Sequence, residues 1–145
     1  MRAVVQRVTS ASVAVAGRIV GSIGPGLCVF VGVTHTDDAD GAHRLAEKLW
    51  HLRVFEDETG KPNRSAADLG LEVLVVSQFT LYADTSRGRR PSYVGAAPPD
   101  HAAPLVERVT SSLEALGARV ATGRFREQMS VSLTNDGPFT VVLDT

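Results

Sequence analysis

Short runs rich in valine and isoleucine, separated by glycine, occupy the first 33 residues of the chain. β-Branched residues favour strands, and glycine commonly marks the turns between them. We therefore expect strands over residues 3–8, 12–17, 18–23 and 27–33, with a hairpin near Gly17. The chain is predicted to begin as a meander of consecutive strands.

Two helices are predicted by apolar residues that recur at helical spacing. The first follows Thr36, Asp37 and Asp38, which can cap or charge the start of a helix, and is expected to end near Leu52. The second is expected over residues 100–116, with Asp100 as its cap and Gly117 just beyond its end.

A polar, turn-rich segment, residues 56–63, is expected to form a loop, and the apolar run 71–77 is expected to form a buried strand. Strands are also expected over residues 118–122, 129–133 and 139–143. The order of strands, helix, strand, helix and strands predicts a mixed α/β fold with two main helices. A length of 145 residues is typical of a single domain, here 1–145.

Composition narrows the class of function. With 43% hydrophobic and 21% charged residues, the chain is typical of a soluble globular protein. Its longest apolar stretch, residues 27–33, is too short to span a bilayer, so we expect a cytoplasmic protein that is not bound to membranes. A formal net charge of -1 excludes indiscriminate coating of nucleic acid and requires any such contact to use a local basic patch.

Common catalytic signatures are missing from the sequence. His43 and His51 lie eight residues apart, not four, so they are interpreted as solvated surface side chains and not as metal ligands. Cys28 lies in an apolar run and is interpreted as a packed thiol. We therefore expect no metal and no cofactor.

Polar side chains cluster where the buried strand 71–77 ends. Ser77, Gln78 and Thr80 surround Phe79, and strand ends are where open sheets present polar groups to ligands. The alternative is that these residues only terminate the strand.

A basic segment follows closely. Arg87, Arg89 and Arg90 crowd one loop beside Tyr93, a combination suited to an RNA backbone, although a solvated basic loop has the same composition.

Gly137 and Pro138 interrupt the last apolar segment. Proline cannot donate to a strand ladder, so this dipeptide predicts either a hairpin turn or a loop that faces a ligand.

Two motifs together resemble the signatures of the D-aminoacyl-tRNA deacylases: "SQFTLYAD" at 77–84 and "NDGPFT" at 135–140. The similarity extends to "MRAVVQRV", "GSIGPGLCVFVGV", "RPSYVGAAPP" and "TGRF", and so covers nearly the whole chain. It implies the family's fold, with a barrel-like mixed sheet. It also implies an enzyme that hydrolyses the ester of D-aminoacyl-tRNA and of mischarged glycyl-tRNA while rejecting L-aminoacyl-tRNA.

The resemblance also implies a homodimer in which each active site joins the "SQFT" segment of one subunit to the Gly-Pro dipeptide of the other. In the family that peptide bond is cis, and its carbonyls hold the ammonium group of the substrate and leave no room for an L side chain. A Cβ at the glycine would intrude on the same pocket. The implied site residues are the catalytic Ser77, Gln78, Phe79 and Thr80; the chirality-selecting Asn135, Gly137 and Pro138; the supporting Arg7 and Met129; and the tRNA-binding Arg87, Arg89 and Arg90.

For the reaction we expect attack by water, assisted by the ribose 2′-hydroxyl, with main-chain N–H groups around Phe79 and Thr80 stabilising the oxyanion. Ser77 and Gln78 would orient the terminal adenosine. Thr80 as a covalent nucleophile is the rival mechanism, but no histidine or lysine nearby in sequence is an obvious base to activate it.

Departures from the family pattern affect the expected pocket. Arg126 and Glu127 stand where the family usually has small residues, and Phe139 stands where valine is common. Arg7 resembles an arginine that holds the Gly-Pro loop, with a surface arginine on an edge strand as the alternative.

A non-catalytic module that binds the tRNA 3′ end remains the alternative function.

Overall fold

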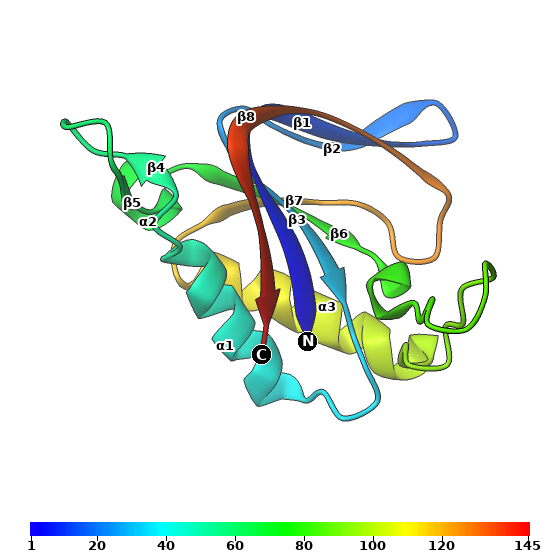
Figure 1. The fold of residues 1–145 in the computed structure, drawn as a ribbon. Helices are drawn as coiled ribbons and strands as arrows, with labels where there is room; N and C mark the ends of the chain where they lie inside the picture. The colour runs from blue at the N-terminus through cyan, green and yellow to red at the C-terminus, as the bar shows by residue number, and fades with distance from the viewer.

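Figure 1 shows a strongly curved sheet with two helices packed against one of its faces. The structure is a computed structural model that describes residues 1–145. Its elements are β1 (Arg2–Val15), β2 (Arg18–Ile23), β3 (Gly26–Gly32), α1 (Ala39–Trp50), β4 (Phe55–Glu56), β5 (Pro62–Arg64), α2 (Ala66–Leu69), β6 (Glu72–Ser77), the 3₁₀ helix η1 (Phe79–Tyr82), α3 (Pro99–Ala115), β7 (Arg119–Thr122) and β8 (Met129–Asp144).

Strand β1 organises the sheet because it is long enough to pair with three others. It runs antiparallel to β2, β3 and β8, while β3, β6 and β7 lie parallel to one another in that order. The sheet curls until β2 approaches β7, where an ideal Cβ on Gly21 would lie 2.5 Å from the carbonyl oxygen of Thr122. The absence of a side chain at Gly21 therefore lets the sheet nearly close into a barrel.

Buried apolar residues form two clusters on the two faces of this sheet. The larger cluster joins β1, β3 and β6 to the apolar faces of α1 and α3. The smaller cluster fills the inside of the curved sheet and contains Cys28 and Leu74, both fully buried. Cys28 is thus a packed thiol, as its apolar neighbours in the sequence predict.

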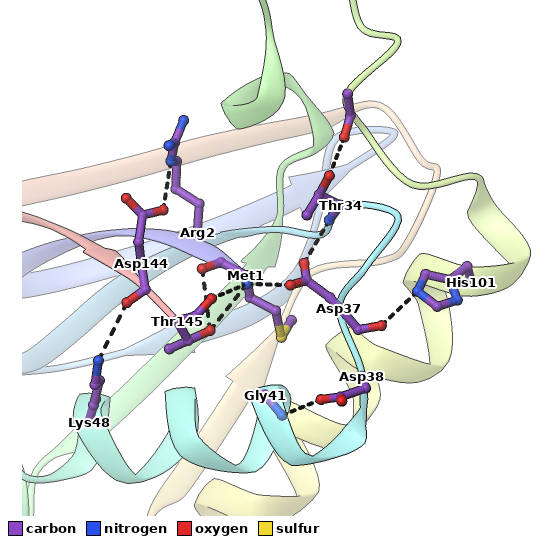
Figure 2. Close-up of polar contacts among 11 residues, drawn as sticks. Met1, Arg2, Thr34, Asp37, Asp38, Gly41, Lys48, His101, Asp144 and Thr145 are labelled. Carbon is purple, nitrogen blue, oxygen red and sulfur yellow. Dashed lines mark hydrogen bonds and ion pairs between the residues drawn. The ribbon is translucent and has the colours of Figure 1, made fainter.

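The two ends of the chain meet beside α1 (Figure 2). The Met1 ammonium group lies 2.6 Å from Asp37 Oδ1 and donates to the carbonyl and hydroxyl oxygens of Thr145, each at 3.1 Å. His101 on α3 contacts the carbonyl oxygen of Asp37 at 2.9 Å. These contacts fasten the entry to α1 to both chain ends and to α3.

The predicted hairpin at Ala16 and Gly17, the strand over 72–77 and the two main helices are all present. The expected meander is wrong, because β3 pairs with β1 and not with β2. The separate strands expected over 3–8 and 12–17 form the single strand β1. Helix α1 ends at Trp50, and its cap is Asp38, which accepts a hydrogen bond from the Gly41 N–H at 2.7 Å. Helix α3 begins earlier than expected, behind Pro98, because proline suits the start of a helix. The expectation that Asp100 is the cap is wrong, since it lies in the first turn.

Three local expectations are wrong or incomplete. Residues 56–63, expected to be a loop, contain most of a small β4–β5 hairpin, and the short helices α2 and η1 were not predicted. The Gly137–Pro138 segment is not a hairpin turn, because β8 continues through it from Met129 to Asp144. Pairing of both halves of β8 with β1 overrides the turn preference of that segment.

Candidate active site

The "SQFT" segment is positioned by the end of β6. The Gln78 N–H extends the strand pairing by donating to the Val31 carbonyl at 2.8 Å, and the chain then turns into η1. Helix η1 packs directly over Gly32 of β3, where an ideal Cβ would lie 3.0 Å from Leu81 Cβ and 3.1 Å from the Gln78 carbonyl oxygen. Gly32 thus permits the close approach that fixes this segment.

A cavity of about 600 Å³ opens beside this strand end. Its walls come from β3, the end of β6, α3, the turn before β8 and the start of β8. Most of the lining is apolar, as in small-molecule sites. Its polar side chains are Ser77, Gln78, Arg126 and Glu127; its apolar lining includes Val33, Phe79, Tyr93, Val106, Phe125 and Met129.

Phe79 and Tyr93 form an aromatic pair in the cavity lining. Their rings meet edge to face, with centroids 5.1 Å apart and an interplanar angle of 66°. Phe79 is 57% exposed and Tyr93 42% exposed, so both present ring surface to solvent. Exposed aromatic faces of this kind suit stacking against a nucleobase.

The Gln78 side-chain amide donates a hydrogen bond to the Thr80 hydroxyl. An amide has no basicity with which to activate that hydroxyl. Thr80 itself is half-buried and does not line the cavity.

The Gly-Pro segment forms a bulge in β8 opposite Arg7. Gln6 pairs with Thr140 and Val8 pairs with Asn135, so residues 136–139 stand opposite Arg7 alone. The peptide bond between Gly137 and Pro138 is cis.

Arg7 is 5% exposed and fastens this bulge from beneath. Its Nε donates to the Asp136 carbonyl oxygen at 3.1 Å, its Nη1 donates to the Val54 carbonyl oxygen at 2.7 Å, and its guanidinium lies 4.2 Å from the centroid of the Phe139 ring. Arg7 Nε also lies 3.0 Å from Asp136 Oδ2, with which it forms an ion pair. The alternative of a surface arginine is therefore wrong.

Asn135 closes the base of the bulge from the other side. Its Nδ2 donates to the Arg7 carbonyl oxygen at 3.0 Å and to the Phe139 carbonyl oxygen at 3.1 Å. Gly137 and Pro138, held between these contacts, are exposed.

The predicted site residues thus form two groups within one chain. Ser77, Gln78, Phe79 and Met129 line the cavity, with Thr80 hydrogen-bonded to Gln78. Arg7, Asn135, Gly137 and Pro138 form the bulge, and none of them lines the cavity.

Arg87, Arg89 and Arg90 are exposed on a loop closed by paired hydrogen bonds between Asp84 and Ser92, at 2.8 and 2.9 Å. None of them forms an ion pair, so their charges are free to contact another molecule.

Sequence reasoning did not identify the wall contributed by α3 or the pairing of Phe79 with Tyr93. Neither had a local signal, because each depends on segments brought together by the fold. The structure contains no cluster of three or more His, Cys, Asp or Glu side chains that could hold a metal ion. No helix is long and apolar enough to cross a membrane.

Residues 4–144 match the family model described as D-Tyr-tRNA(Tyr) deacylase. The chain is 59% identical to a D-aminoacyl-tRNA deacylase of Streptomyces coelicolor over 99% of each chain. It is 55% identical to one of Thermus aquaticus over 100% of this chain and 95% of the relative. One similar solved structure is titled "c-Myc DNA Unwinding Element Binding Protein" (TM-score 0.93, 38% identity, coverage 100% and 99%). A probable eukaryotic D-amino acid tRNA deacylase has the same fold at 17% identity (TM-score 0.87, coverage 99% and 98%).

Proposed function

Since this chain belongs to the D-Tyr-tRNA(Tyr) deacylase family, we propose that its cavity and its Gly-Pro bulge together carry out deacylation with selection for D-amino acids. The chain is a D-aminoacyl-tRNA deacylase, a hydrolase that cleaves the ester bond between a D-amino acid and tRNA. The observation that supports our assignment of the site is the cavity at the end of β6, which is lined by Ser77, Gln78 and Phe79 of the first family motif.

In this proposal, the terminal adenosine of tRNA lies in the cavity. Ser77 and Gln78 supply its hydrogen-bonding groups, and the rings of Phe79 and Tyr93 supply apolar surface for its base. The D-amino acid ester then lies at the start of η1.

Attack by water requires donors aimed at the developing oxyanion. Phe79 and Thr80 are the first residues of η1, and the first N–H groups of a helix have no partner within it. No side chain caps this end of η1. We assign these two N–H groups to the oxyanion and the attack to water assisted by the ribose 2′-hydroxyl.

Nucleophilic attack by Thr80 is the competing mechanism, and it is disfavoured because the Thr80 hydroxyl is hydrogen-bonded to an amide instead of a base. Thr80→Ala should therefore retain measurable single-turnover hydrolysis. Complete loss of turnover with intact tRNA binding would support Thr80 as the nucleophile.

For chirality, we propose that the main-chain carbonyls at Gly137 and Pro138 of one subunit enter the cavity of a partner subunit. There they would hold the substrate ammonium group and exclude an L side chain. Two observations support this arrangement: the bulge is exposed, and it does not line the cavity of its own chain. Arg7 and Asn135 would keep its carbonyls in a fixed direction.

The decisive experiment compares amino-acid release from D-tyrosyl-tRNA and L-tyrosyl-tRNA by the wild type and Gly137→Ala. An ideal Cβ on Gly137 would lie 3.2 Å from Asn135 Oδ1 and 4.0 Å from Asn135 Cγ, with no other non-neighbouring heavy atom within 4 Å, so the variant should fold. We expect fast release from the D ester by the wild type and slower or less selective release by the variant.

Gly24→Ala is the matched control, because the atom nearest to an ideal Cβ there is Glu72 Oε1 at 3.7 Å. Unchanged rates and selectivity in Gly137→Ala would contradict the filter. If the wild type bound tRNA but left the D ester at its spontaneous hydrolysis rate, the alternative of a non-catalytic module for the tRNA 3′ end would be correct.

A filter built from main chain predicts broad tolerance of D side chains. It also predicts hydrolysis of glycyl-tRNA, because glycine has no side chain to exclude.

We assign binding of the tRNA backbone to Arg87, Arg89 and Arg90. Replacing each by Gln should weaken tRNA binding and reduce its salt dependence.

A further inference from the structure

An arginine occupies a backbone conformation that favours glycine at the edge of the catalytic cavity. The Glu127 N–H donates to the Arg124 carbonyl oxygen at 3.3 Å, which closes a four-residue turn between β7 and β8. The third residue of this turn is Arg126, with a φ of 65°. Turns with positive φ at this position favour glycine or asparagine, so arginine is unfavourable for the local backbone.

The Arg126 side chain forms no ion pair and no hydrogen bond within the protein. It is exposed, yet it lines the same cavity as Ser77, Gln78 and Phe79. No contact within the fold therefore accounts for a cation at this strained position, and an unfavourable backbone conformation at a ligand site is a recognised indication of function.

We propose that Arg126 binds a backbone phosphate of the single-stranded 3′ end of tRNA and so positions the terminal ester in the cavity. This inference rests on the proposed function, which places the terminal adenosine between the strand end and the aromatic pair. The phosphodiester that joins that adenosine to the preceding nucleotide must then leave through the cavity edge. A guanidinium is suited to phosphate because its N–H groups match the oxygens in a bidentate arrangement.

The neighbouring Glu127 gives the proposal a second, opposite test. Its carboxylate lines the same cavity and also lacks an ion pair, so it would repel the phosphate that Arg126 attracts. Removal of the two charges should change tRNA affinity in opposite directions.

The experiment measures kcat and KM for two substrates that carry the same ester: D-tyrosyl-tRNA and D-tyrosyl-adenosine, which has no phosphate. For Arg126→Gln we expect KM for D-tyrosyl-tRNA to rise about tenfold, the size of one hydrogen-bonded charge contact. We expect kcat to stay within about twofold and both constants for D-tyrosyl-adenosine to be unchanged. The slope of log KM against log salt concentration should decrease by about 0.7, as expected for the loss of one contact to a single-strand phosphate.

Variants separate this role from a structural one. Arg126→Gly should raise the unfolding midpoint, because glycine suits the positive φ, and should still raise KM for the tRNA substrate. Arg126→Lys should recover part of the affinity, and Glu127→Gln should lower KM. Arg44→Gln is the matched control, since Arg44 is an exposed cation on α1 that does not line the cavity.

Equal constants for wild type and Arg126→Gln on D-tyrosyl-tRNA would overturn the phosphate contact while leaving deacylation intact. Equal losses on both substrates would also overturn it, because D-tyrosyl-adenosine offers no phosphate. If the wild type hydrolysed neither substrate, the proposed function itself would be refuted instead.

Discussion

At the scale of single residues, the buried cation Arg7 decides the conformation of the Gly-Pro bulge. Its guanidinium contacts two backbone carbonyls, one carboxylate and one aromatic ring. Such a group stabilises the fold only while its partners remain in place, because an uncompensated buried charge is unfavourable. The orientation of Asp136 and Phe139 is therefore tied to that of Arg7.

We predict that Arg7→Met lowers the free energy of unfolding by about 1.5 to 3 kcal/mol, the range for hydrogen bonds to charged groups. Selectivity between D and L esters should fall with it, because the bulge loses its anchor. Urea denaturation and parallel deacylation assays measure the two effects. Arg64→Met, which breaks the exposed pair with Glu58, should change stability by less than about 1 kcal/mol. Equal small effects in both variants would contradict the anchoring role.

Cys28 makes the stability of the fold depend on pH in the alkaline range. Burial raises the pKa of its thiol to about 11. The folded state therefore keeps its proton at pH values where the unfolded state, with an ordinary pKa of about 8.5, loses it. The stability linked to this group is fully present below that ordinary value and is lost as pH rises toward about 11.

We predict that the free energy of unfolding of the wild type falls more steeply between about pH 8 and about pH 10.5 than that of Cys28→Ala. This range extends to about two pH units above the ordinary thiol pKa. Urea denaturation at several pH values gives the two curves. Tyr82, whose pKa burial raises to about 12, is present in both proteins and cancels in the comparison. Parallel curves would show that the thiol does not titrate in this way.

At the scale of elements, the position of η1 depends on how closely it packs against β3. We predict that Gly32→Ala slows deacylation about tenfold, because the added Cβ would displace η1 by a few tenths of an ångström and a misplacement of about 1 Å can cost about a hundredfold. Stability should fall by only about 1 to 3 kcal/mol, as for overpacking elsewhere. Steady-state kinetics and denaturation report the two effects, with Gly24→Ala as the control. Normal kinetics in Gly32→Ala would mean that η1 tolerates the displacement.

At the scale of the whole molecule, the two signature motifs lie in separate places on one chain, so a complete site requires two chains in our proposal. A 1:1 mixture of Gln78→Ala and Gly137→Ala chains, unfolded and refolded together, should recover about a quarter of wild-type activity. Half of the resulting dimers would carry one intact site of two. Sedimentation at micromolar concentration should show a dimer. If the mixture is no more active than its better component, each chain must build its own site.

Local patterns in the sequence were sufficient for much of this architecture. Valine-rich runs predicted β2, β3, β6 and the two halves of β1, and apolar spacing predicted α1 and α3, because a short strand or helix is determined largely by its own residues. The same reasoning identified Cys28 as buried, since its immediate neighbours are apolar. The two family motifs identified the candidate site residues without any structure.

Only the tertiary structure decided the backbone path at Gly137 and the burial of Arg7. By itself, a Gly-Pro pair in a polar stretch predicts a turn or a loop, yet β8 runs through it because β1, at least 114 positions earlier, pairs with both of its halves. The same pairing buries Arg7 and so decides between the two roles that the sequence allowed, an anchor of the Gly-Pro loop and a surface residue on an edge strand. The position of Arg126 at the cavity edge likewise depends on the packing of β6, α3 and β8 around one space. Strand register and cavity walls are set by contacts between distant segments, and these contacts have no local signature in the chain.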